Sequence, residues 1–132
     1  MIVENQLYPS SETIASLLAD VSDKRIVSSI CSNFVPMPHT TTGALTGREA
    51  YWIYADAMQK IIVREGGRLL FSGDILSVPI GKVEEIWDMA ALIEYPSAAA
   101  FARIASSVEV SEIAVHRAAG LAGQLLIRTR SA

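Results

Sequence analysis

The chain has 132 residues, of which 51% are hydrophobic and 19% charged, which fits one globular domain and excludes a disordered chain. Its 11 Lys and Arg residues against 14 Asp and Glu residues give a formal net charge of −3, so nucleic-acid binding has no electrostatic support. The single cysteine, Cys31, rules out an internal disulfide, and no apolar run approaches the roughly 18 residues of a membrane span. The N-terminus lacks a signal-peptide pattern, so we expect a cytoplasmic protein that inserts into no membrane.

In chain order, the first expected element is a short helix over 12–19, which follows Pro9-Ser10-Ser11. We interpret residues 1–24 as an N-terminal helical extension and residues 25–132 as the main domain. A strand over 25–35 follows, because apolar side chains alternate between two faces, with Ile26, Ile30 and Phe34 on one and Val27, Cys31 and Val35 on the other. Residues 36–46 form a loop by their Pro, Thr and Gly content.

A capping box, Thr46 followed by Glu49, predicts a long helix over 47–65 that ends at Gly66-Gly67. Its inner face carries Tyr51, Tyr54, Ala55, Met58 and Ile62.

The C-terminal half is expected to hold a strand over 68–74 with an extended continuation over 75–80, and a strand over 86–95. Ser97 can cap the next helix, which should break at 107–110 before a second helical piece over 111–119. Gly120 and Gly123 are interpreted as bracketing a turn into a last strand over 124–129.

After the first helix the order is β-α-β-β-α-β, which predicts an α+β, ferredoxin-like split βαβ fold with an antiparallel sheet and its helices on one face. The strands are apolar on both faces. Leu69 and Phe71 alternate with Leu70, and Trp87, Met89 and Ile93 alternate with Ile86, Ala90 and Leu92. Helices can cover only one face, so we expect a homodimer that closes through the open face of the sheet.

Four segments resemble, in the same order, the domain-of-unknown-function family numbered 1330, a member of the dimeric α/β-barrel superfamily. They are 46–54 (TGREAYWIY), 66–73 (GGRLLFSG), Trp87-Asp88 with 94–97 (EYPS), and 116–121 (HRAAGL). The resemblance covers about residues 25 to 130 and implies the same fold and the same dimer. It implies little about function, because that family has no agreed activity.

Arg117 and His116 are the first candidates for chemistry. A histidine at a helix end can act as an acid or a base, and an arginine can hold a carboxylate with two hydrogen bonds. The alternatives are an Arg117 that pairs with Asp88 or Glu94 and a His116 on a solvated helix face.

Tyr51 and Tyr54 share a helix face and can line a pocket between helix and sheet, or pack in the core with their hydroxyls bonded to backbone. Trp52 points elsewhere, toward the surface or an interface. Asn33 can orient a small ligand from its strand or tie down the following loop.

Other polar residues have simpler explanations. Glu49 belongs to the capping box, Arg48 to the surface or an anion contact, His39 to a solvated loop, and Cys31 to a buried strand position. Neither a metal site nor a cofactor is expected, because no ligand spacing or phosphate-binding loop occurs.

Three classes of function stay open: a metal-independent enzyme acting on a small hydrophobic or aromatic metabolite, a non-catalytic binding protein for such a molecule, and a structural dimer with a filled cavity. A cavity between helices and sheet favours the first two.

Overall fold

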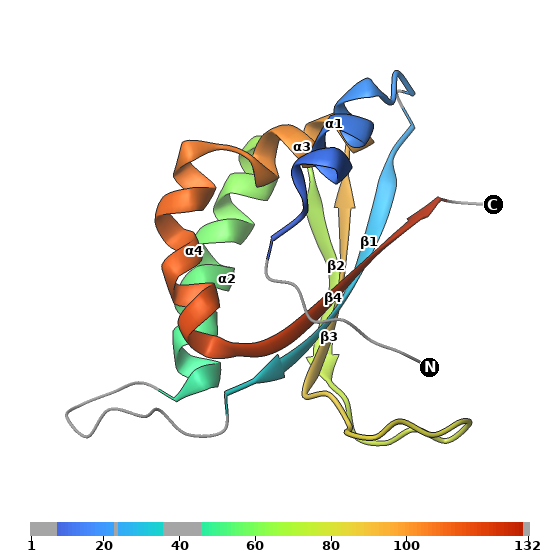
Figure 1. Cartoon of the computed structure of the whole chain (residues 1–132), viewed down its shortest axis with the longest axis vertical. Helices are drawn as coiled ribbons and strands as arrows, with labels where there is room; N and C mark the ends of the chain where they lie inside the picture. The colour runs from blue at the N-terminus through green and yellow to red at the C-terminus, as the bar shows by residue number, and fades with distance from the viewer. Residues whose placement is uncertain (1–7, 23, 36–45, 131–132) are drawn as a thin grey trace.

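The computed structural model describes residues 8–22, 24–35 and 46–130. Four strands form one antiparallel sheet in the order β2-β3-β1-β4 (Figure 1). Along the chain the elements are α1 (Ser11–Ala19), β1 (Ile26–Phe34), α2 (Gly47–Arg64), β2 (Arg68–Asp74), β3 (Met89–Tyr95), α3 (Ala98–Ala105), α4 (Val108–Gly120) and β4 (Leu121–Arg130). The predicted α+β class is confirmed, and the arrangement is consistent with a ferredoxin-like fold.

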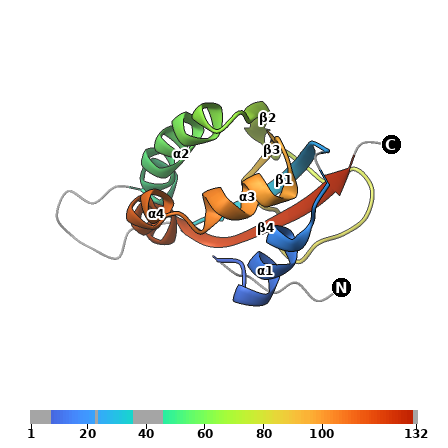
Figure 2. The same cartoon turned by 90° about the horizontal axis from the view of Figure 1, so that it is seen from above.

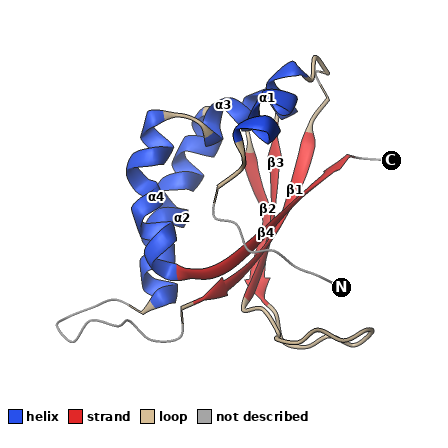
Figure 3. Cartoon of the chain, viewed as in Figure 1, coloured by secondary structure: helices blue, strands red, loops and turns tan. Residues whose placement is uncertain are grey.

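The helices gather on one face of the sheet. α2 and α4 lie side by side, and α3 lies between them and the strands (Figure 2). α1 packs against α3 near one end of β1 and β4 (Figures 1 and 3). Within the described residues, the other face of the sheet carries no helix. No helix in this part of the chain is long and apolar enough to cross a membrane.

Each helix begins at a hydroxyl side chain. Ser10, Thr46, Ser97 and Ser107 each accept a hydrogen bond from the backbone N–H three residues later, which satisfies an amide that the first turn leaves free. At α2 the bond from Glu49 N to Thr46 Oγ1 measures 3.1 Å. These local signals explain why the predicted starts of α2 and α3 are confirmed. The expected break over 107–110 is wrong in its extent, because Ser107 caps α4 and the helix begins at Val108 instead of residue 111.

Two predicted strand segments lie outside the sheet. The continuation expected over 75–80 and the first residues of the strand expected from Ile86 belong to a loop that extends beyond β2 and β3 (Figure 1). Ile75 N still donates to Asp88 O at 2.9 Å, but Leu76 and Ile80 are about nine-tenths exposed (88% and 92%). No other described element packs over these apolar residues, so their sequence pattern alone does not extend the strand.

The turn expected at Gly120 is also wrong, because β4 follows α4 directly. Gly120 instead lets α4 approach α2. A Cβ atom at this position would lie 2.5 Å from the Gly47 carbonyl oxygen and 2.7 Å from the Tyr51 nitrogen. The absence of a side chain therefore sets the spacing between the two helices.

Burial in β1 alternates strictly, with Ile26, Ser28, Ile30, Ser32 and Phe34 facing the helices. In β2 a bulge changes the register, so that Leu69 pairs with Ile93 on the helix side while Phe71 pairs with Leu92 on the opposite side. The expectation that Leu69 and Phe71 share a face is therefore wrong.

Candidate ligand-binding site

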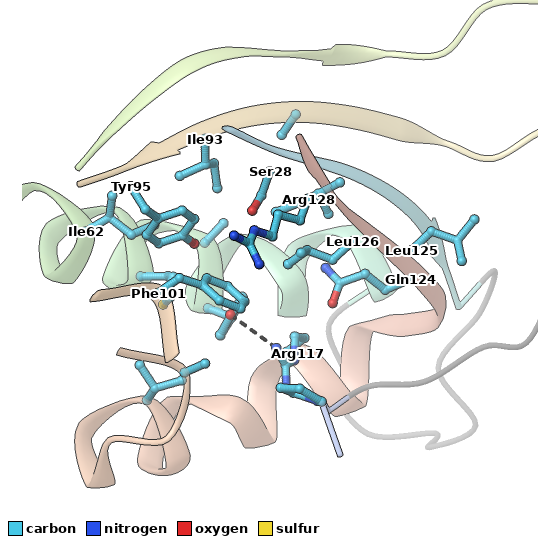
Figure 4. Close-up of a pocket in the computed structure, with 18 of the residues that line it drawn as sticks. Ser28, Ile62, Ile93, Tyr95, Phe101, Arg117, Gln124, Leu125, Leu126 and Arg128 are labelled. Atoms are coloured by element: carbon cyan, nitrogen blue, oxygen red, sulfur yellow. Dashed lines mark hydrogen bonds between the residues drawn. The ribbon is translucent and has the colours of Figure 1, made fainter. Parts of the chain in front are cut away.

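A cavity of about 800 Å³ lies between the helices and the inner face of the sheet (Figure 4). Its walls are mainly apolar, and every layer contributes to them. The larger apolar lining residues include Leu17 from α1, Ile26 and Ile30 from β1, Met58 and Ile62 from α2, Leu69 from β2, Met89, Ile93 and Tyr95 from β3, Phe101 from α3, and Leu126 from β4. The volume falls in the range of about 300–1,000 Å³ that is typical of small-molecule sites.

Arg117, in the last turn of α4, brings a positive charge to the cavity wall. Its Nη1 donates a long hydrogen bond, 3.4 Å, to the hydroxyl oxygen of Tyr54 on α2 (Figure 4). The guanidinium carbon lies 5.2 Å from the centroid of the Tyr54 ring and 4.7 Å from that of Tyr8. Its Nε is buried and has no hydrogen-bond partner among the described residues.

Three buried tyrosines, Tyr51, Tyr54 and Tyr95, line the cavity. Burial raises the pKa of Tyr51 to about 12, and burial likewise raises the pKa values of Tyr54 and Tyr95. The nearby Ser32 hydroxyl opposes the rise in the pKa of Tyr51. It forms no hydrogen bond of normal geometry with a described residue. All three phenols therefore stay protonated at neutral pH and can donate a hydrogen bond to a ligand.

The sheet presents polar groups opposite Arg117. Ser28 on β1 is fully buried, and its hydroxyl has no hydrogen-bond partner in the described part of the chain. Arg128 on β4 is the cross-strand neighbour of Ser28 and points over the cavity (Figure 4). Arg128 pairs with Asp20, the residue that ends α1. Its charge is thereby neutralised by Asp20, whereas Arg117 forms no ion pair with any residue that the structure describes.

The N-terminal helix contributes to the site directly. Thr13 and Leu17 of α1 line the cavity, and Tyr8, just before the helix, stacks on Arg117. Asp20 connects the far end of α1 to β4. These contacts make α1 a wall of the cavity.

The structure brings together three of the predicted site residues, Tyr51, Tyr54 and Arg117. Asn33 does not join them, because it lies on the opposite face of β1 from Ser28 and Ser32 and does not line the cavity. A strand alternates its side chains with a period of two, so Asn33 and the inner serines cannot share a face. His116 is half-buried and does not line the cavity either.

The alternative pairing of Arg117 with Asp88 or Glu94 is wrong. Glu94 accepts from Arg25 and Arg68, at 3.1 Å each, and Asp88 accepts from the Phe34 backbone at 2.7 Å. The hydroxyl of Tyr54 contacts Arg117 and forms no hydrogen bond to the backbone of any residue in the described ranges. The aromatic partner of Phe101 is Tyr95, not Tyr54: the ring centroids of Phe101 and Tyr95 are 5.0 Å apart.

The remaining candidates lie elsewhere or near the rim. Arg48 pairs with Asp74 at 2.9 Å on the surface, and Trp52 is 45% exposed at the edge of the cavity. Cys31 is half-buried on the outer face of the sheet, so the expectation of a buried position is wrong. His39 lies outside the described residues. No group of three His, Cys, Asp or Glu side chains that could hold a metal ion occurs in the described ranges.

Sequence reasoning missed four polar groups of the site: Ser28, Gln124, Arg128 and Asp20. For Ser28 a signal existed, because this serine alternates in step with Ile26 and Ile30 on the apolar face of β1. A hydroxyl at such a position indicates a polar contact or a cavity. Arg128 and Asp20 are 108 residues apart, and no local pattern connects them.

Together these features define an α+β protein with a ligand-sized cavity between its helices and an antiparallel sheet. Two solved structures resemble this chain: a protein of unknown function, RPA0582, from Rhodopseudomonas palustris, and methylated RPA0582 protein. Both are 27% identical to this chain, cover 98% of it with a TM-score of 0.84, and are themselves covered over 98% and 97% of their length. No family model and no curated protein matches the chain.

Proposed function

We propose that this protein binds a small, largely hydrophobic molecule in the cavity between its helices and its sheet. The observation that carries the proposal is the cavity of about 800 Å³ with apolar walls and a few converging polar groups. Protein interiors normally pack without such voids, so a space of this size argues against a core filled by its own side chains.

Binding fits the lining better than catalysis does. Among the polar groups of the lining, Arg117 and the protonated Tyr51 and Tyr54 can donate hydrogen bonds at neutral pH, and the two lining carboxylates, Glu12 and Asp56, are exposed. A general base would need a pKa near the working pH, and neither described His nor Cys side chain, His116 or Cys31, lines the cavity.

An enzyme that polarises a carbonyl group is the second candidate. Arg117 and the hydroxyl of Tyr54 are in contact and could together stabilise a developing oxyanion. Turnover of a hydrophobic ketone or ester that Tyr54→Phe abolishes would favour this function over binding alone.

We also propose that two copies pair through the outer face of the sheet in a split βαβ, dimeric α/β-barrel arrangement, in line with the resemblance to the family numbered 1330. Phe71, Leu92 and Ile127 expose 56%, 37% and 52% of their surface on that face. A second copy would cover them by an isologous contact.

Fluorescence titration with anilinonaphthalene sulfonate tests the binding proposal. The wild-type protein should bind the probe, and Ala91→Leu, which places a larger side chain in the cavity from β3, should weaken binding by at least about tenfold. Ala118→Leu, on the exposed side of α4, is the matched control and should bind as the wild type does.

Two outcomes would contradict the proposal. The first is a wild-type protein that binds neither this probe nor any compound extracted from the freshly purified protein. The second is an Ala91→Leu variant that keeps full affinity, because binding would then take place outside the cavity.

A further inference from the structure

We infer that the ligand of this cavity carries a carboxylate, and that Arg117 and Tyr54 bind it. The inference rests on the proposed function and specifies the chemical class of the bound molecule. It starts from the unequal charge balance of the two arginines that line the cavity.

Arg128 has its counter-charge within the chain, since Asp20 pairs with it. Arg117 forms no ion pair with any described residue, and its contacts are the rings of Tyr54 and Tyr8 and the hydroxyl of Tyr54. A cation that is partly withdrawn from water, without an anion, costs free energy that a bound anion would restore. Among the described residues that line the cavity, Arg117 is therefore the partly buried cation without an ion pair, while the lining carboxylate Glu12 is exposed and does not pair with it.

The free donors at this position suit a carboxylate. Nη1 of Arg117 donates to the Tyr54 oxygen and Nε is buried, whereas Nη2 forms no hydrogen bond with a described residue and is not buried. Because Tyr54 accepts that bond, its own hydroxyl hydrogen is available to another acceptor. Two oxygens of one planar group can take these two donors together, as in paired arginine–carboxylate contacts.

Two aromatic rings near the guanidinium restrict its orientation. Tyr8 and Tyr54 lie 4.7 and 5.2 Å from its carbon and restrict the rotation of a side chain that is otherwise flexible. A donor set that is held in place before binding loses less entropy when the ligand arrives.

The apolar walls of the cavity indicate the chemical character of the ligand beyond its carboxylate. Met58, Phe101, Ile93 and Leu126 offer apolar walls from the helices and the sheet, so the part of the ligand beyond its carboxylate should be aliphatic or aromatic. One arginine and one phenol match a single negative charge, which favours a monocarboxylate over a phosphate ester with two charges.

Calorimetric titration with matched pairs tests the inference: decanoate against decanol, and naphthoate against naphthalenemethanol. Wild-type protein should bind each carboxylate at least about tenfold more tightly than its alcohol, because hydrogen bonds to charged groups are the stronger ones. Arg117→Met should remove this preference, because it weakens the binding of the carboxylates far more than that of the alcohols. Arg103→Met, which removes an exposed charge of α3 away from the cavity, should keep the preference.

The outcomes separate this inference from the proposed function. If the alcohols bind wild-type protein as tightly as the carboxylates, the carboxylate inference is overturned and the binding function stands. If no member of either pair binds, both fall. Tighter binding of decyl phosphate than of decanoate would also overturn the inference.

If Arg117→Met does not fold, two milder variants decide the question. Tyr54→Phe should reduce the carboxylate preference several-fold, and Arg117→Lys should keep part of it, since the charge is retained without the planar pair of donors. An undiminished preference in Tyr54→Phe, with a melting curve like that of the wild type, would contradict the role given to its hydroxyl.

Discussion

Arg117 is positioned by its neighbours more than by its own helix. Tyr54 comes from α2 and Tyr8 from the segment before α1, and both approach the guanidinium of a residue near the end of α4. The dipole at the C-terminal end of α4 adds a favourable interaction with this charge. The candidate site thus depends on three segments that are distant in the sequence.

The buried tyrosines predict a loss of stability at high pH. Burial raises the pKa of Tyr51 to about 12, above its ordinary value of about 10. Between these values the unfolded chain loses the proton and the folded protein keeps it, so the stabilising contribution is complete below about pH 10 and is lost as the pH rises toward 12.

Urea unfolding at a series of alkaline pH values should show this decline. The slope from Tyr51 alone should approach about 1.4 kcal/mol per pH unit, and Tyr51→Phe should remove that share of it. A free energy of unfolding that does not change above pH 10, in wild type and variant alike, would show that Tyr51 ionises in the folded protein as it does in the unfolded chain.

At the scale of elements, the sequence predicts the buried face of β1 but not that of α1. The alternation of β1 is readable along the chain, including the inward positions of Ser28 and Ser32. The role of α1 is not readable in this way. At helical spacing Ile14, Leu17 and Leu18 share one side, yet Leu18 is 46% exposed while Leu17 is buried. A nine-residue helix has too few turns for its sequence to define a buried face. The packing of α1 against α3 decides which side is buried.

The contact between Asp20 and Arg128 predicts how α1 is held over the cavity. Asp20→Asn removes the charge that pairs with Arg128, so the amides of α1 should exchange their hydrogens faster while those of α2 keep their rates. Hydrogen exchange followed by mass spectrometry measures both. Asp56→Asn is the matched control, because Asp56 pairs with Lys60 on the exposed side of α2.

The same contact has a defined pH dependence. The backbone N–H of Ser22 and then Arg128 hold the pKa of Asp20 below its usual value. The contribution of Asp20 is therefore complete above the ordinary carboxyl pKa and is lost as the pH falls through the lowered one. Equal protection of α1 in wild-type protein and Asp20→Asn at neutral pH would mean that the ion pair does not hold the helix.

At the scale of the whole molecule, the outer face of the sheet predicts self-association. Leu92 lies on that face of β3 between Ser29 of β1 and Phe71 of β2. Leu92→Lys would bury a charge at the proposed interface and should convert dimers to monomers, as measured by light scattering or sedimentation. Val115→Lys, which replaces an exposed apolar residue of α4, should leave the assembly unchanged. A wild-type protein that is monomeric at micromolar concentration would contradict the dimer.

The sequence by itself determined the kinds of element and most of their limits. Caps such as Thr46, the alternation in β1 and the stop at Gly66 are local signals, because a helix start, a strand face or a turn depends on residues within a few positions of one another. The tertiary structure alone decided the order of the strands, the bulge at Leu70 and the role of Gly120 between two helices.

The cavity was likewise decided only in three dimensions. Its volume is the space that remains when two layers pack, and no residue encodes it alone. The position of Arg117 in the sequence makes it a candidate, but only the fold shows that Glu94 and Asp88 are bonded to other groups and that Arg117 has no ion pair among the described residues. Interactions between residues close in the sequence therefore predict the helices and strands of this protein. The pairing of charges at its site depends on the tertiary fold.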